Sequence, residues 1–246
     1  MLLWIIGFAL LGSIGAIAVA ALFLLFPEGI RRVLIPHLVS YATGTLLGAA
    51  FLGMIPAGLK QAPANLVMTT ILAGMILFFV LEKLVLWRHH HDSHERGAKK
   101  RSGSLILIGD AFHNFVDGIV ITAAFLTSIP LGMTTALAVI AHEIPQEVGD
   151  FAILLDSGYE RKKALFLNSL SAAATLPGAV MAYFWLGEMH DATPYILALS
   201  AASFIYVATA DMIPGLHQQV TPAASLRQIL LLLMGIGTIA LFHFRG

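Results

Sequence analysis

The sequence predicts an all-α, polytopic membrane protein with eight transmembrane helices. Of its 246 residues, 58% are hydrophobic and only 11% are charged, whereas a soluble domain carries charge on about a quarter of its residues. Mean hydropathy is +0.86, and apolar runs near the roughly 20 residues that cross a bilayer recur along the whole chain. We therefore expect a single transmembrane domain over residues 1–246, with no room for a second domain.

Eight apolar runs define the expected helices. They are Leu2–Phe26, His37–Leu59, Leu66–Trp87, Ser104–Leu126, Leu131–Leu155, Ala164–Leu186, Tyr195–Gly215 and Leu226–Phe244. The first two are rich in small residues, which allow close helix packing, and the third ends at Glu82 and Lys83, whose charged heads can reach the water interface. The fourth and fifth carry rows of polar residues. Near the ends of the third, sixth and seventh runs lie Trp87, Tyr183, Trp185 and Tyr195, as in the aromatic belts of membrane proteins.

Basic residues gather on one side of these helices. Of the 14 Lys and Arg residues, eleven follow helices 1, 3, 5 and 7. They are Arg31, Arg32, Arg88, Arg96, Lys99, Lys100, Arg101, Arg161, Lys162, Lys163 and Arg227. Only Lys60 and Arg245 lie on the other side, and Lys83 lies within helix 3. The positive-inside rule then predicts that both termini are outside the cytoplasm.

The longest soluble segment, residues 88–103, is expected to be a histidine-rich cytoplasmic loop. Four of its histidines fall within six residues, from His89 to His94. Clustered imidazoles bind zinc, copper or nickel, and the alternative is a flexible basic loop that only sets the topology. Elsewhere, the lack of cysteine excludes disulfides and thiolate metal sites. No basic stripe with interleaved aromatic residues indicates a nucleic-acid partner.

Two rows of polar residues lie within the fourth and fifth apolar runs. Residues three and four apart share one face of a helix. The first row is Asp110, His113, Asn114 and Asp117, and the second is His142, Glu143, Gln146, Glu147 and Asp150. Polar groups at bilayer depth normally face the bundle interior, where they mark an ion or substrate path. The alternative, hydrogen bonding that only holds the helices together, would not need so many charges.

The two rows are expected to face each other, because successive helices run antiparallel and both rows lie near mid-membrane. At about 1.5 Å per residue, His113 and Gln146 lie at one level, and Asp117 and His142 at another. The patterns His-Asn-x-x-Asp-Gly and His-Glu-x-x-Gln-Glu also echo each other, as in transporters built from inverted repeats. Imidazole, carboxylate and amide ligands suit zinc, and also iron, manganese or cadmium.

Two other classes of protein are weighed against a carrier. The His-Glu pair at residues 142–143 would begin the His-Glu-x-x-His helix of zinc proteases, but Gln146 stands where the second His is required. A membrane metalloenzyme is therefore the weaker alternative. No Gly-Lys-Ser/Thr phosphate loop is present, which excludes an ATP-driven pump in this chain alone. Acidic steps at Asp110, Glu147 and Asp150 fit the release of an ion better than hydrolysis.

The chain resembles the Zrt-/Irt-like (ZIP) divalent metal transporters, and in particular their histidine-rich branch. The resemblance spans all eight helices. Its two signatures are His113-Asn114-Phe-Val-Asp117-Gly118 and His142-Glu143-Ile-Pro145-Gln146-Glu147-Val-Gly-Asp150, and Gly74-Met-Ile-Leu-Phe-Phe-Val-Leu-Glu82-Lys83 with Trp87-Arg-His-His-His resembles helix 3 of the branch. It implies a carrier, not an enzyme, that imports zinc into the cytoplasm by alternating access, with helices 1, 4, 5 and 6 moving against 2, 3, 7 and 8. A broader iron, manganese or cadmium range is the alternative. It further implies no cofactor besides the transported ion, and a homodimer in the lipid bilayer of a plasma (bacterial inner) membrane.

The resemblance also implies two metal positions. One takes His113, Asp117, His142 and Gln146, and the other takes Asn114, Asp117, Glu143 and Gln146 with a residue of helix 6 that aligns to Thr175. The branch usually has His in place of Gln146, and some relatives have a carboxylate in place of Thr175. An amide is a poor ligand and cannot bridge two cations as a carboxylate does. We therefore expect one tightly held ion, with a second ion weak or absent.

Overall fold

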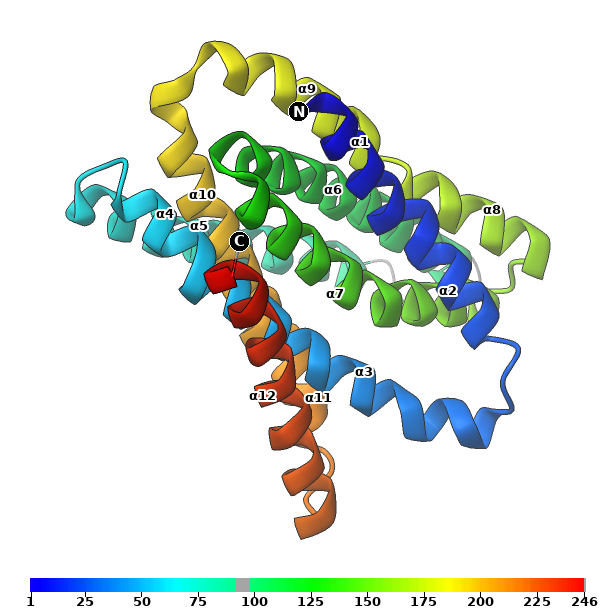
Figure 1. Ribbon diagram of the computed structural model, residues 1–246. Helices are drawn as coiled ribbons and strands as arrows, with labels where there is room; N and C mark the ends of the chain where they lie inside the picture. Colours follow the sequence, from blue (N-terminus) through cyan, green and yellow to red (C-terminus); the bar gives the residue numbers. More distant parts are fainter. Residues whose placement is uncertain (92–97, 246) are drawn as a thin grey trace.

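Helices joined by short turns make up the part of the chain that the computed structural model describes, residues 1–91 and 98–245. In chain order they are α1 (Leu2–Leu10), η1 (Leu11–Gly15), α2 (Ala16–Phe23), α3 (Glu28–Gly48), η2 (Ala49–Met54), α4 (Ile55–Leu59), α5 (Ala64–His91), α6 (Ala98–Thr127), α7 (Ile129–Asp156), α8 (Arg161–Ala172), α9 (Thr175–Glu188), η3 (His190–Ala192), α10 (Thr193–Tyr206), η4 (Val207–Met212), α11 (Ile213–Leu216) and α12 (Pro222–Arg245). Several continue into one another, so these residues form eight long rods and no strand (Figure 1).

Seven of the rods in the described residues are long and apolar enough to cross a membrane. The remaining rod is α7, whose polar row between His142 and Asp150 lowers its hydropathy. Its 28 residues extend about 42 Å at 1.5 Å per residue, and it packs along α6, α3 and α2 inside the bundle. The prediction of an all-helical polytopic membrane protein is confirmed.

One helix begins well before its apolar run. α3 starts at Glu28, nine residues before the expected start at His37. Pro27, at φ −53° and ψ 146°, precedes it, and an exposed Arg32–Glu28 ion pair of 2.9 Å lies across its first turn. Glu and Arg four residues apart favour a helix slightly. The apolar runs missed these turns because charged residues interrupt the hydrophobic pattern.

The expected loop at residues 88–103 is helical at both ends. α5 continues to His91, and α6 already begins at Ala98. Residues 92–97, which include His94 of the histidine tract, lie outside the described residues. The segment between the two long helices is therefore shorter than the apolar runs indicate.

The rods pack as two groups of four that meet at α3 and α7. In the first group α6 packs against α9, α7 and α8, with α1 and α2 along α9 and α7. In the second group α3 packs against α12, and α5 packs against α10. Figure 1 shows α12 crossing α3 at one side of the molecule, away from α6 and α8. These are the groups of helices that the resemblance implies move against each other.

Close backbone contact between α6 and α9 requires glycine on both helices. A Cβ atom at Gly118 would collide with the Thr175 carbonyl, and one at Gly178 would collide with the Phe115 carbonyl. The close approach also lets the Thr175 hydroxyl donate to Asn114 Oδ1 at 3.0 Å. Gly118 therefore sets the separation between the α6 polar row and α9.

Replacing Gly118 with alanine is expected to destabilise the protein by about 1–3 kcal/mol, as overpacking of a tight contact does. The measurement is thermal unfolding of purified protein in detergent. Gly109→Ala is the matched control, because Gly109 is also in α6 and a Cβ atom there would meet nothing within 4 Å. Equal unfolding temperatures for the two variants would contradict the proposed role of Gly118.

Two rods share a widened turn at corresponding places. The π-helices η2 and η4 are each six residues long and end at the methionine of a Met-Ile-Pro sequence, at residues 54–56 and 212–214. Proline has no N–H and leaves an upstream carbonyl without its helical partner, which favours such a turn. The second widened turn carries Asp211, which lines a cavity next to the polar rows.

Candidate metal centre

A one-residue connection brings the two polar rows opposite each other. Ser128 separates α6 from α7, and its hydroxyl accepts a hydrogen bond of 3.3 Å from the Leu131 amide at the start of α7. Pro130 occupies the first turn of α7, where a missing N–H costs nothing. The two helices consequently pack side by side in opposite directions.

Four side chains from these rows converge on one point, with spacings that suit a tetrahedral metal. His113 Nε2 lies 3.1 Å from His142 Nε2, 3.8 Å from Asp117 Oδ2 and 3.6 Å from Glu143 Oε1. His142 Nε2 lies 3.3 Å from Asp117 Oδ2 and 3.5 Å from Glu143 Oε1. Ligands about 2.0–2.2 Å from zinc lie about 3.3–3.6 Å apart at the corners of a tetrahedron. We call these four residues the His–Asp cluster.

Burial makes the His–Asp cluster costly without a cation. Asp117, His142 and Glu143 are each 0% exposed. Neither oxygen of Asp117 or of Glu143 accepts a hydrogen bond within the described residues. A buried carboxylate without such partners costs several kcal/mol, and a divalent cation among the four side chains would offset that cost.

A hydrogen bond from the far side of the ring orients His142. Its Nδ1 lies 3.0 Å from the Ala138 carbonyl, which can only accept, so Nδ1 carries the proton. Nε2 is then left with its lone pair toward the cluster, as in most histidine metal ligands. Phe204 of α10 closes the other side, with ring centroids 6.0 Å apart in an edge-to-face arrangement.

The amide nitrogens of Gln146 and Asn114 both contact Asp110. Gln146 Nε2 donates to Asp110 Oδ1 at 3.1 Å, and Asn114 Nδ2 donates to the same oxygen at 3.0 Å. The Asn114 carbonyl oxygen is itself occupied by the Thr175 hydroxyl. The resemblance implies Gln146 as the fourth ligand beside the two histidines, and that assignment stays a prediction. In the structure the Glu143 carboxylate lies 3.5–3.6 Å from both imidazoles.

Replacing Gln146 with glutamate should destabilise the metal-free protein, because it exchanges an amide donor for a carboxylate next to Asp110. We expect a lower unfolding temperature without divalent metal and a larger rise on adding zinc than in the unmodified chain. Thermal unfolding with and without zinc measures both quantities. Gln61→Glu, at an exposed position that only contacts the Ala57 carbonyl, is the control. An unchanged unfolding temperature in Gln146→Glu would refute the role assigned to this amide.

A second set of carboxylates lies beside the first. Oxygen atoms of Asp110, Glu143 and Glu147 approach to within 4.8 Å of one another, and all three residues are buried. We call them the acidic cluster. Glu143 belongs to both clusters. Asp150 interacts with Asp110 and is half-buried, but belongs to neither cluster.

Sequence reasoning missed several polar groups that reach the site from other helices. Asn168 of α8 donates from Nδ2 to the carboxylate of Glu147. Glu82 of α5, Tyr206 and Asp211 line a cavity of about 360 Å³ together with His113, and the Tyr206 hydroxyl donates to Glu82. Asn168 and Asp211 are polar residues inside apolar runs, which is the same signal that picked out α6 and α7.

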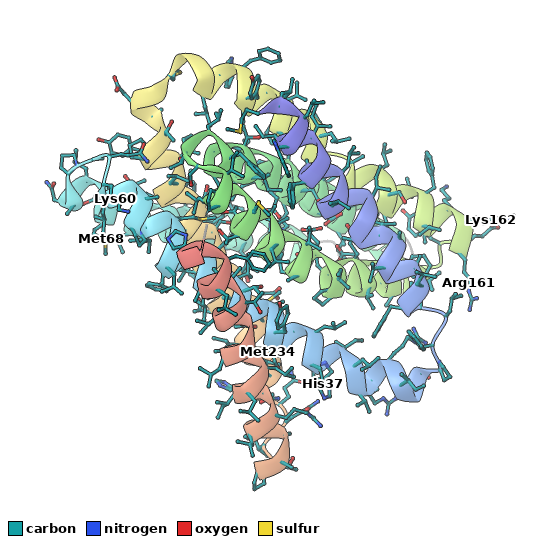
Figure 2. All side chains as sticks on the ribbon, viewed as in Figure 1. His37, Lys60, Met68, Arg161, Lys162 and Met234 are labelled. Carbon is teal, nitrogen blue, oxygen red and sulfur yellow. The ribbon has the colours of Figure 1, made fainter. Side chains whose placement is uncertain are left out.

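Three of the basic residues, Lys60, Arg161 and Lys162, lie as the alternating direction of the helices predicts. Figure 2 shows Arg161 and Lys162 at one end of the bundle and Lys60 at the opposite end. Both ends are exposed. The polar rows of α6 and α7 lie between them.

Known proteins similar to this chain are zinc transporters. Residues 89–243 match the family described as ZIP Zinc transporter. Zinc transporter ZIP13 of Pongo abelii is 34% identical over 221 residues, which cover 84% of this chain and 66% of that protein. Zinc transporter SLC39A7 of Mus musculus is 30% identical over 327 aligned positions, covering 94% and 68%. Zinc transporter zipt-7.2 of Caenorhabditis elegans is 37% identical over 141 residues, covering 56% and 30%.

The fold and the site together define a polytopic membrane protein whose helical bundle encloses a candidate metal centre. The family match covers more than half of the chain. The chain belongs to the ZIP zinc transporter family, as its resemblance in sequence implies. It spans about two thirds of the length of the ZIP13 and SLC39A7 relatives.

Proposed function

We propose that the chain is a divalent metal carrier that imports zinc into the cytoplasm through the His–Asp cluster. The observation that carries this proposal is the set of five distances, from 3.1 to 3.8 Å, among four named ligand atoms. Two imidazoles and two carboxylates suit zinc, and iron, manganese and cadmium are the alternative cargo. The names of the zinc-transporting relatives support the same choice.

The site favours a carrier over a metalloenzyme. Catalytic zinc sites keep a position open for water or substrate, with three ligands from the protein. Here four protein atoms lie within 4.8 Å of one another, close enough for the protein alone to fill a tetrahedral coordination shell. Such a set binds an ion and releases it when the helices that carry the ligands shift, which is what transport requires.

The surroundings of His113 suggest how the ion would gain access by alternating opening. The side chain of His113 is 21% exposed and borders the cavity of about 360 Å³. Its walls come from α6 of the first helix group and from α5, α10 and η4 of the second. A shift between the two groups would therefore widen or close the cavity directly beside a ligand. Import is the direction that the family resemblance implies. The positive-inside assignment gives the orientation, in which Asp110, Glu147 and Asp150 lead toward the cytoplasmic side.

Metal uptake into proteoliposomes tests the proposal. Purified protein is expected to accumulate radiolabelled zinc, and competition with iron, manganese and cadmium ions ranks the substrates. Protein-free vesicles made in parallel serve as the control. Uptake no faster than in those vesicles, with folded protein present, would overturn the proposed function.

We also propose a homodimer in a plasma (bacterial inner) membrane. Rows of large apolar side chains remain exposed on α5 and α12, as expected for surfaces that meet lipid or a second copy. Mass measurement of the protein in lipid nanodiscs distinguishes one copy from two. A single copy at all concentrations would contradict the dimer.

The histidine tract is expected to receive or sense zinc after passage and not to form the path. Replacing His89, His90, His91 and His94 with serine should change initial zinc uptake by no more than about threefold, roughly 0.65 kcal/mol. Initial rates in proteoliposomes measure this effect. Complete loss of uptake at equal protein amounts would place the tract in the path.

A further inference from the structure

We infer a second cation position, built from oxygen atoms alone, in the acidic cluster of Asp110, Glu143 and Glu147. Asn168 of α8 donates a hydrogen bond to the Glu147 carboxylate and so fixes its position. The inference deepens the proposed function, since it describes where the ion goes after the His–Asp cluster. It differs from the second position that the resemblance implies, which uses Asn114, Asp117, Glu143 and Gln146.

Two of the three carboxylates, Asp110 and Glu147, have one oxygen held by a hydrogen bond, and all three have an oxygen that accepts none. Asp110 Oδ1 accepts from Asn114 and Gln146, and Glu147 Oε2 accepts from Asn168. Glu143 Oε1 lies beside the two imidazoles. Within the described residues, Asp110 Oδ2, Glu147 Oε1 and Glu143 Oε2 accept no hydrogen bond. Three neighbouring carboxylates, each with a free oxygen and two of them oriented by amide donors, are what a cation site requires.

Burial indicates that these free oxygens belong to a site and not to a solvated surface. Asp110 is 5% exposed, and Glu143 and Glu147 are each 0% exposed. Asn168 is 2% exposed, and its Oδ1 also lacks a hydrogen-bond partner. Ion pairs of the described residues join none of the three carboxylates to Lys or Arg. A bound cation would supply the missing positive charge.

Asn168 acts as a positioning residue for Glu147. Its Nδ2 contacts both the carboxylate of Glu147 and, at 3.3 Å, the Glu147 carbonyl. This pair of contacts ties α8 to α7 and fixes which carboxylate oxygen remains free. In the same way, Gln146 and Asn114 each donate a hydrogen bond to Asp110 and fix its carboxylate.

The donor atoms predict different metal preferences for the two clusters. Carboxylate and carbonyl oxygens suit hard cations such as manganese and magnesium, whereas imidazole favours zinc. Because Glu143 belongs to both clusters, two dications bound together would repel each other across one shared carboxylate. An ion in one cluster therefore weakens binding at the other, which favours passing a single ion between them.

Manganese binding to purified full-length protein tests the inference without relying on transport. In the double variant His113→Ala, His142→Ala, the first cluster is disabled, and we expect one manganese ion per chain to bind still. Adding Glu147→Gln or Asp110→Asn should weaken that binding at least about tenfold. Asn168→Ala should weaken it less, and Asn168→Asp should not restore it, because the donor to Glu147 remains lost. Glu28→Gln, at an exposed position paired only with Arg32, is the matched control.

Calorimetric titration and manganese paramagnetic resonance report stoichiometry and affinity, and thermal unfolding shows which variants fold. The two carboxylate variants provide independent tests if one fails to fold. No manganese bound to the folded double histidine variant would overturn the inference, as would unchanged affinity in the folded carboxylate variants. If the titration showed protons leaving the protein and no manganese bound, the acidic cluster would hold protons and not a cation, which would also overturn the inference. Failed zinc uptake with intact manganese binding would instead refute the proposed transport and leave this position standing.

Discussion

Radiolabelled zinc uptake falls to background when His113 or Asp117 is replaced with alanine, if the His–Asp cluster is the site of passage. His113 Nε2 and Asp117 Oδ2 are two of the four corners, 3.8 Å apart on successive turns of α6. Either change leaves three ligands at most, and Asp117→Ala also removes a charge from a site that is 0% exposed. Initial uptake rates in cells at equal surface expression measure the effect.

A matched histidine variant separates loss of the site from general damage. His217 is exposed at the end of α11 and contributes to neither cluster. His217→Ala should therefore transport zinc at the normal rate. Near-normal uptake in His113→Ala or Asp117→Ala would place the path elsewhere in the bundle.

The sequence was sufficient to predict which helices carry the polar rows and which residues of those rows share a level. Rise per residue places Asp117 opposite His142, and the two side chains lie 3.3 Å apart. The same arithmetic places His113 level with Gln146, yet the Gln146 amide contacts Asp110 instead. Helical rise fixes depth, but rotation of each helix about its axis and the choice of rotamer decide the partners.

The helical rise could not predict which side chains of other helices reach the two polar rows. Asn168 and Thr175 approach the rows only because α8 and α9 pack tightly against α6 and α7. That packing depends on glycine contacts between residues about 60 positions apart, such as Gly118 with Thr175. The position of the Glu143 carboxylate beside the two imidazoles also depends on how α7 is turned toward α6. These are tertiary facts that no local pattern contains.

Glu143 combines two properties, and replacing it is therefore expected to have opposite effects on transport and on stability. It is the residue shared by the His–Asp cluster and the acidic cluster. It is also 0% exposed, with both carboxylate oxygens lacking hydrogen-bond partners within the described residues. In the proposed carrier the first property makes Glu143 necessary for metal binding, and the second makes it costly to the stability of the metal-free fold. Function and stability therefore make opposite demands at this position.

Glu143→Gln is accordingly expected to abolish zinc uptake while stabilising the metal-free protein. The amide has the same shape but no charge, so removing the buried charge should raise the free energy of unfolding by about 1–3 kcal/mol. Zinc affinity should fall at least about tenfold, or 1.4 kcal/mol, because the amide is a poor ligand. Thermal unfolding without metal, calorimetric zinc titration and uptake measure the three quantities. Glu160→Gln, at an exposed position before α8, should leave all three unchanged. A Glu143→Gln protein that unfolds at a lower temperature yet binds zinc normally would make Glu143 a packing residue and not a ligand.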